Sequence, residues 1–343
     1  MSKKVLITSR SFGKISNEPL DILTGAGFEV TMKGKDFDQA EFEAMIPDYD
    51  ALIIGAHEFP EAVMERCPKL KIICKHGAGL DNIHLEKAKE LGIAVCNVPG
   101  TNSNAVADLT FGLMLAVARN IVSTNRWVHE GRWQTAIGVD VCGKTLGLMG
   151  FGAIAKNVAR RANGFGMKVL AYDPYVKELP EEFRSYVTLC SENEVISGCD
   201  FLSLHLPLND ETRNMISAPQ LASMKAGAYV INAARGGIVN EKDLYEALAS
   251  GHIAGAAMDV SEVEPMAAEN PLRTLDNVII YPHIGGNTTE AAHRASYFAA
   301  MGIQEVYEGK APTWPINDVD YKTAKTYTDT KKPDTKPAGM FDF

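Results

Sequence analysis

The sequence lacks the features of membrane proteins and nucleic-acid-binding proteins. No apolar stretch reaches the roughly 18 residues that a membrane helix needs, and the apolar run at residues 5–9 is too short for a signal peptide. Basic residues are the minority, with 34 Lys and Arg against 43 Asp and Glu, and the formal net charge is −9. Without a basic stripe, the chain is a poor partner for nucleic acid or anionic lipid, so neither is expected.

Cysteine is scarce as well. The six cysteines include no CxxC pair, which argues against a zinc ribbon or a thioredoxin motif, and we predict no metal site. Several cysteines lie inside apolar runs, as buried free thiols of a reducing compartment do. We therefore expect a soluble, cytoplasmic protein.

What the chain does have is an ordinary globular composition, with 46% apolar and 22% charged residues. Its 343 residues favour two domains. Short apolar runs alternate with longer segments of helical period, which is typical of parallel α/β sheets. Strands are predicted at residues 5–8, 28–31, 51–54, 71–74 and 93–97, and again at 145–149, 168–172, 201–206, 228–232, 254–259 and 278–281.

The two strand series predict an α/β fold class with two doubly wound parallel-sheet domains, Rossmann-like or flavodoxin-like. Between the series, residues 104–120 are apolar on nearly all sides of a helix, as a buried helix is. We interpret this helix as a bridge between domains or subunits. Residues 321–343 have little to bury, which predicts a flexible tail.

A glycine-rich segment predicts a dinucleotide site. Residues 145–155, TLGLMGFGAIA, match G-x-G-x-x-G/A after a strand and before a helix. Gly150 permits the tight turn, Gly152 lets the backbone approach a pyrophosphate, and Ala155 allows close packing of helix on strand. Alone this is a weak signal. Asp173 strengthens it, because a carboxylate about 20 residues further on binds a ribose hydroxyl and repels a 2′-phosphate. The cofactor predicted is NAD.

Three polar residues follow separate strands of the second series: Arg235, Glu264 and His283. In a parallel sheet such residues meet at the carboxyl edge, where ligands bind. Arg binds a carboxylate or carbonyl in bidentate fashion, His exchanges a proton near neutral pH, and Glu holds the imidazolium. Each alone is more often a surface ion-pair member, but together, beside a dinucleotide site, they predict catalysis. His205 is interpreted as a wall residue beside the cofactor, and His57 as one of several surface or capping histidines.

Five ordered motifs resemble those of the D-isomer-specific 2-hydroxyacid dehydrogenases, and most closely the phosphoglycerate dehydrogenase branch. They are KHGAGLDN at 75–82, GKTLGLMGFG at 143–152, NAARGGIV at 232–239, DVSEVEP at 259–265 and PHIGG at 282–286. The resemblance implies a substrate domain from residues 1–100 plus 291–320 and an NAD domain from residues 101–290. It also implies a homodimer or homotetramer built on the NAD domain.

The same resemblance implies roles for individual residues. Arg235, Glu264 and His283 would be catalytic, and Asp259 would bind the nicotinamide carboxamide. The substrate would contact Arg235 and the segment formed by Lys75, Gly77, Ala78 and Gly79. The expected cofactor-binding residues are Gly150, Gly152, Ala153, Ile154, Asp173, Leu206, Pro207, Thr212, Ala233, Asp259 and Gly285.

The expected reaction interconverts a D-2-hydroxy acid and its 2-oxo acid with NAD. Lys75 favours a substrate with a second anionic group, such as 3-phosphoglycerate or 3-phosphohydroxypyruvate. Two departures oppose it: Gly55-Ala56-His57 stands where phosphate-specific members tend to place Arg, and no regulatory domain follows. Glyoxylate, hydroxypyruvate or a D-lactate-type acid is the alternative. Formate dehydrogenase, which pairs its His with Gln, is disfavoured by Glu264, and an NAD-sensing corepressor is the non-enzymatic alternative.

Overall fold

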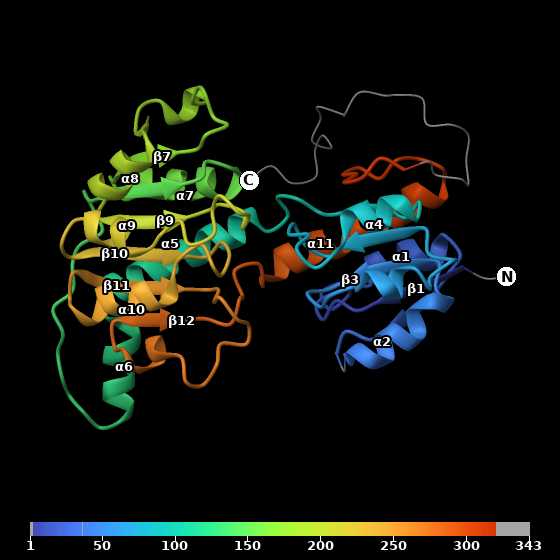
Figure 1. Cartoon of the computed structure of the whole chain (residues 1–343), viewed down its shortest axis with the longest axis horizontal. Coiled ribbons are helices and arrows are strands. Elements are labelled where there is room, and N and C mark those ends of the chain that lie inside the picture. The colour runs from blue at the N-terminus through green and yellow to red at the C-terminus, as the bar shows by residue number, and fades with distance from the viewer. Residues whose placement is uncertain (1–2, 36, 320–343) are drawn as a thin grey trace. The chain divides into compact units, whose positions relative to one another are not determined.

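The computed structural model describes residues 3–35 and 37–319. The described residues form two compact units, one from residues 3–35, 37–101 and 289–319 and the other from Asn102–Thr288. Each unit has a parallel sheet covered by helices on both faces (Figure 1). This confirms the predicted fold class. The tail predicted at residues 321–343 lies outside the described residues.

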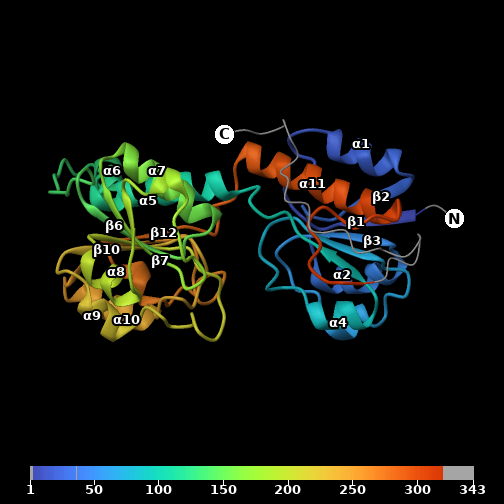
Figure 2. The same cartoon turned by 90° about the horizontal axis from the view of Figure 1, so that it is seen from above.

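The first unit has a five-stranded sheet in the order β2-β1-β3-β4-β5, the flavodoxin-like order. Helices α1 and α11 cover one face, and α2 and α4 the other (Figure 2). Its elements are β1 (Lys3–Ile7), α1 (Glu18–Gly25), β2 (Phe28–Met32), α2 (Gln39–Met45), η1 (Ile46–Asp48), β3 (Ala51–Ile54), α3 (Glu61–Met64), β4 (Ile72–Lys75), α4 (Leu85–Glu90), β5 (Ala94–Cys96) and α11 (Thr289–Tyr307).

The second unit has a seven-stranded sheet in the order β12-β11-β10-β9-β6-β7-β8. Helices α5 and α7 pack on one face, and α8, α9 and α10 on the other (Figure 2). Its elements are α5 (Ser103–Ala118), α6 (Ile121–His129), β6 (Thr145–Met149), α7 (Ala153–Gly164), β7 (Lys168–Tyr172), η2 (Glu181–Phe183), β8 (Val187–Leu189), α8 (Glu192–Gly198), β9 (Phe201–Leu204), α9 (Ala218–Ser223), β10 (Ala228–Asn232), α10 (Glu241–Ala249), β11 (Ile253–Met258), η3 (Pro271–Thr274) and β12 (Val278–Ile280).

The apolar segment predicted as one helix over residues 104–120 is a helix that ends two residues earlier. Helix α5 stops at Ala118, and Asn120 adopts a left-handed conformation with φ of 54°. Helix α6 then starts at Ile121, with a bend of 64° between the two axes. Within its unit α5 packs against α7 and strands β10, β11 and β12. Among the described residues, no single helix is long and apolar enough to cross a membrane, although the bent pair α5–α6 together has that length and composition.

Because the strands of each sheet are parallel, the candidate site residues that follow them lie at one edge of that sheet. All pairings in both sheets are parallel, so the loops after the strands of one sheet share one edge. In the second unit the strand order reverses between β6 and β9. Ligands of doubly wound folds bind at this kind of reversal, and here the loops after β6 and β9 begin with Gly150 and His205.

Candidate active site

The glycine turn after β6 is tight and leaves the N-terminus of α7 open. Gly150 has φ of 90°, and a Cβ there would lie 2.7 Å from the carbonyl oxygen of His205, so only glycine fits. Gly152 is the N-cap of α7 and has no side-chain cap, while a Cβ added to it would meet nothing within 4 Å. Ala155 is fully buried against the sheet. The first turn of α7, with Ala153 and Ile154, therefore offers an uncapped, open helix N-terminus to an anion.

Asp173 lies at the end of β7, beside this turn. Its Oδ2 accepts a hydrogen bond from the Phe151 backbone N–H at 2.8 Å, and its Oδ1 accepts one from the Tyr175 N–H at 2.9 Å. The side chain thus ties the glycine turn to the strand end as well as placing a negative charge there. That charge has the location predicted for selection against a 2′-phosphate.

The loop after β9 forms the other side of the order reversal. Thr212 is buried and its hydroxyl donates to the Pro207 carbonyl at 2.7 Å, which holds the loop containing Leu206. His205 Nε2 lies 2.9 Å from Ser203 Oγ, and its Nδ1 has no hydrogen-bond partner among the described residues. Burial lowers the pKa of His205 to about 3, so the ring is neutral. This agrees with a wall residue rather than a proton donor.

The structure brings the side chains of His283 and Glu264 into contact. His283 Nδ1 lies 2.8 Å from Glu264 Oε2, and both side chains remain accessible, at 49% and 40% exposure. Arg235 follows β10, and its Nη1 donates to the Ala234 carbonyl at 2.8 Å. Strands β10, β11 and β12 are adjacent, so the loops that carry the three residues lie side by side at one edge.

Close backbone contact joins these loops. A Cβ on Gly236 would lie 1.8 Å from the carbonyl oxygen of Ser261, so the loop of Arg235 rests directly on the loop of Glu264. Glu241, the first residue of α10, was not singled out from the sequence, and it holds the loop of Glu264 in place. Its Oε1 accepts from the Glu262 N–H at 2.7 Å, while Glu262 Oε1 accepts from the Glu241 N–H at 3.0 Å. This pairing joins residues 21 positions apart, and no sequence motif predicts it.

Asp259 is buried at the end of β11, with 1% exposure. Its Oδ1 and Oδ2 accept backbone hydrogen bonds from Ile284 at 2.9 Å and Gly285 at 2.8 Å. Burial raises the pKa of Asp259 above its ordinary value, against the opposing effect of these two N–H groups. Ala233, at the end of β10, is also nearly buried.

The predicted substrate-binding segment lies in the first unit, after β4. Gly77 has φ of 155° and its carbonyl accepts from the Val98 N–H, while the Ala78 carbonyl accepts from Asn97 Nδ2 at 2.8 Å. Lys75 Nζ donates to the Gly55 carbonyl and to Asn82 Oδ1, both at 2.7 Å. Asn82 therefore joins Lys75 to the loop of Gly55, and Asn97 holds the carbonyl of Ala78. Sequence reasoning did not predict these contacts, because they join separate loops.

The interpretation of His57 as a surface or capping residue holds only in part, because the residue is half-buried. Its ring stacks on Phe37 with a centroid distance of 4.0 Å, Nδ1 lies 3.0 Å from the Glu58 carbonyl, and Nε2 lies 2.8 Å from Thr8 Oγ1. Burial, the largest cause, lowers the pKa of His57 to about 4. His57 is thus neutral, and each of its ring nitrogens has a hydrogen-bond partner at this edge of the sheet.

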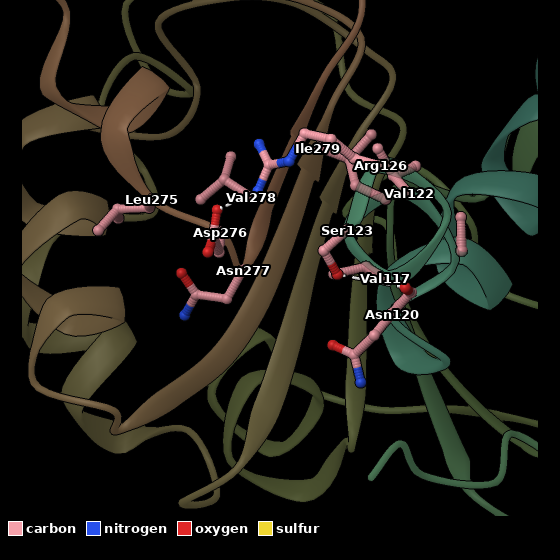
Figure 3. Close-up of a pocket in the computed structure, with 11 residues that line it drawn as sticks. Val117, Asn120, Val122, Ser123, Arg126, Leu275, Asp276, Asn277, Val278 and Ile279 are labelled. Carbon is pink, nitrogen blue, oxygen red and sulfur yellow. Dashed lines mark hydrogen bonds and ion pairs between the residues drawn. The ribbon is translucent and has the colours of Figure 1, made fainter. Parts of the chain in front are cut away.

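A small pocket of the second unit lies away from these loops. It has a volume of about 50 Å³ and lies between the α5–α6 bend and the segment entering β12 (Figure 3). Arg126 and Asp276 form an ion pair of 2.5 Å at its rim. None of the predicted site residues lines it, so it is not the candidate active site.

Comparisons with known proteins point to one family. The family model described as "D-isomer specific 2-hydroxyacid dehydrogenase, NAD binding domain" matches residues 111–285. A hydroxypyruvate reductase of Thermotoga maritima is 43% identical over 291 residues, which cover 81% of this chain and 92% of that protein. A D-3-phosphoglycerate dehydrogenase of Methanocaldococcus jannaschii is 40% identical over 317 residues, or 92% of this chain and 59% of that relative.

A solved structure has the same architecture. A crystal structure of a Thermus thermophilus protein matches with a TM-score of 0.84 at 36% sequence identity, covering 92% of this chain and 100% of that one. The likeness therefore extends over both units.

Proposed function

The chain belongs to the D-isomer-specific 2-hydroxyacid dehydrogenase family and is an NAD-dependent oxidoreductase; we propose that Arg235, Glu264 and His283 carry out its reaction. The observation that carries this proposal is the His283–Glu264 pair of 2.8 Å on loops adjacent to that of Arg235. A carboxylate partner also fits an acid–base histidine better than the glutamine of a formate dehydrogenase would.

The residues at the glycine turn fit a dinucleotide. The open helix end at Gly152 and the carboxylate of Asp173 would hold its pyrophosphate and ribose. When bound, NADH supplies the hydride for the keto carbon. His283 then gives a proton to the carbonyl oxygen as general acid, and Glu264 stabilises the imidazolium before transfer. Arg235 polarises the same oxygen and binds the carboxylate.

For the substrate we favour a short 2-oxo acid with an uncharged third carbon, of the hydroxypyruvate type. His57 is neutral and both of its ring nitrogens already have partners. Gly55 itself has no side chain to supply a cation, and a Cβ there would lie 3.1 Å from the Thr8 carbonyl oxygen, a tight contact. The preference for an anionic acid, expected from the sequence, then depends on Lys75, whose ammonium already donates to Gly55 and Asn82.

The test is a comparison of kcat/KM for hydroxypyruvate, glyoxylate, pyruvate and 3-phosphohydroxypyruvate with NADH. The proposal predicts the highest value for hydroxypyruvate. The highest value for 3-phosphohydroxypyruvate, with a loss confined to that substrate in Lys75→Ala, would restore the anionic expectation. Absence of turnover with every 2-oxo acid would refute the proposed reaction.

We further propose that the protein is a homodimer formed through the second unit. Large apolar side chains of α6 and the segment after it are exposed: Ile121 52%, Val122 46%, Val128 49%, Trp133 89% and Ile137 100%. Several exposed large apolar side chains within one short segment of chain favour a protein interface. A second copy is the occupant that the family resemblance implies.

Light scattering after gel filtration tests the dimer. The double variant Trp133→Glu with Ile137→Glu is expected to be a monomer, whereas Tyr175→Glu, at an 86% exposed position of the same unit, is expected to keep the wild-type mass. A wild-type mass of one chain would contradict the proposal.

A further inference from the structure

Asp259 contacts the loop of His283 with its backbone and its side chain. Its carbonyl oxygen accepts from the His283 N–H at 2.8 Å. Its two carboxylate oxygens accept from the N–H groups of Ile284 and Gly285, at 2.9 and 2.8 Å. Three successive N–H groups of the loop therefore bond to one residue of the neighbouring strand.

The loop needs such a constraint. His283 adopts a left-handed conformation with φ of 54°, which a residue with a β-carbon holds only where its surroundings impose it. The side chain is half exposed, and Glu264 contacts it from one side. Hydrogen bonds to an ionised acceptor are the stronger kind, so the Asp259 carboxylate is the main fixed point of this turn.

Gly285 belongs to the same arrangement. A Cβ on this residue would lie 2.9 Å from Asp259 Oδ2 and 3.4 Å from a methyl carbon of Val106. The distance to Asp259 Oδ2 is too short for a Cβ, whereas the distance to Val106 is an ordinary van der Waals contact. The absence of a side chain at Gly285 therefore lets the loop settle onto the carboxylate.

We propose that Asp259 is a positioning residue, whose carboxylate holds the 283–285 loop so that His283 presents its imidazole for proton transfer. This differs from the carboxamide contact that the family resemblance implies. The inference rests on the proposed function for its kinetic consequences, but the hold on the loop can be measured without turnover.

The experiment compares Asp259→Asn with wild type by three readouts. The amide hydrogens of Ile284 and Gly285 should exchange about 10–100-fold faster, the loss of about 1.5–3 kcal/mol expected when a charged acceptor is removed. At saturating NADH, kcat should fall about 10–100-fold, because small displacements of a catalytic group are costly. The dissociation constant of NADH should change less than about threefold, since the pyrophosphate and ribose contacts remain.

Asp200→Asn is the matched control. Asp200 also accepts a backbone N–H with its carboxylate, from Thr145 at 2.8 Å, but it precedes β9 and so lies at the opposite edge of the sheet. We expect this variant to keep the wild-type kcat and the wild-type exchange rates at Ile284 and Gly285.

Gly285→Ala provides a second test if Asp259→Asn does not fold. Its added methyl group should displace the loop and give the same faster exchange and lower kcat. Unchanged exchange, or faster exchange with unchanged kcat at saturating NADH, would overturn the inference. Weakened NADH binding with normal kcat would instead support the carboxamide contact and overturn it too. A wild-type protein without reductase activity would refute the proposed function, while the exchange rates would still test the hold on the loop.

Discussion

At the scale of single residues, the hydrogen bond of His283 decides which ring nitrogen can act. Glu264 as a carboxylate only accepts, so Nδ1, 2.8 Å away, must be the donor. This leaves Nε2 as the atom that can give a proton to a substrate oxygen. The pairing also orients the ring, because rotation about its side-chain bonds would break the contact.

Replacing His283 with Gln should lower kcat by about 10²–10⁴, the usual contribution of general acid–base catalysis. The affinity for NADH should be nearly unchanged, because the glycine turn and Asp173 are untouched. Steady-state assays measure kcat, and fluorescence titration with NADH measures its affinity. Glu264→Gln, which keeps a hydrogen-bond acceptor without the charge, should lose less than the His283 variant. Wild-type turnover in His283→Gln would remove this residue from the mechanism.

Asp173 should set the choice of cofactor. Its carboxylate accepts from the Phe151 and Tyr175 N–H groups, so Ala would loosen the turn as well as remove charge. Asp173→Asn is the sharper change, because it keeps an acceptor oxygen. We expect this variant to have a lower kcat/KM with NADH than wild type. The ratio of kcat/KM with NADH to kcat/KM with NADPH should therefore fall. A wild-type enzyme that already prefers NADPH would contradict the role of Asp173.

Sequence reasoning located the residues whose chemistry is local to a motif. Glu264 and His283 were predicted to pair because each follows a strand, and the structure brings them into contact. The contacts of Glu241 and Asn82 and the half-buried packing of His57 were not anticipated. Their partners lie on other loops, and the register between loops depends on packing that a one-dimensional pattern does not contain.

At the scale of secondary structure, the buried central strands were predictable because helices cover both sheet faces, so these strands are apolar without alternation. Strand β10, AYVIN, is buried at every position. The three-residue strand β8 at Val187–Leu189 was missed, since it is an edge strand with too few residues to show a period. The end of α5 was also missed, because Asn120 terminates it through a backbone conformation.

Helix α11 should depend on the absence of a side chain at Gly302. A Cβ there would lie 3.0 Å from Cys96 Sγ and 3.6 Å from Cys74 Sγ, both buried beneath the helix. Gly302→Val should lower the free energy of unfolding by about 1–3 kcal/mol through overpacking. Urea unfolding followed by circular dichroism measures the change.

Gly164→Ala is the matched helical control for that substitution. Gly164 ends α7, and a Cβ there would meet nothing within 4 Å. Alanine should therefore be neutral or should stabilise by about 0.5–1 kcal/mol through helix propensity. Equal effects of the two substitutions would show that the contact with the cysteines does not constrain α11.

At the scale of the whole molecule, each unit has its own pair of apolar layers and its own reversal of strand order. The alternation of strands and helices predicted this class of fold, since few architectures bury such a pattern. The composition of the chain does not reveal the substrate, because substrate choice depends on how side chains from separate loops are arranged around it. The cytoplasmic location and the dimer stay predictions.

Buried neutral histidines should make the protein sensitive to acid. Burial lowers the pKa of His76 from 6.5 to about 4 and that of His205 to about 3, with His57 also near 4. Below about pH 6.5 the unfolded chain binds protons that the native state does not, so the free energy of unfolding falls as the pH falls from 6.5 toward 4. Well above pH 6.5 these histidines are neutral in both states and do not change the free energy of unfolding with pH. The raised pKa of Asp259 acts in the opposite direction, but at lower pH.

Each of His76 and His205 should cost about 1.4 kcal/mol of stability between pH 7.5 and 5.5, and the more exposed His57 should cost less. His76→Gln keeps a donor for Ser296, whose hydroxyl lies 2.9 Å from Nε2, yet cannot take up a proton. Urea unfolding at both pH values should therefore show a shallower pH dependence for this variant than for wild type. His129→Gln, at an exposed site on α6, should keep the wild-type dependence. If His76→Gln loses as much stability as wild type over this range, the native imidazole of His76 is protonated there and the burial argument fails.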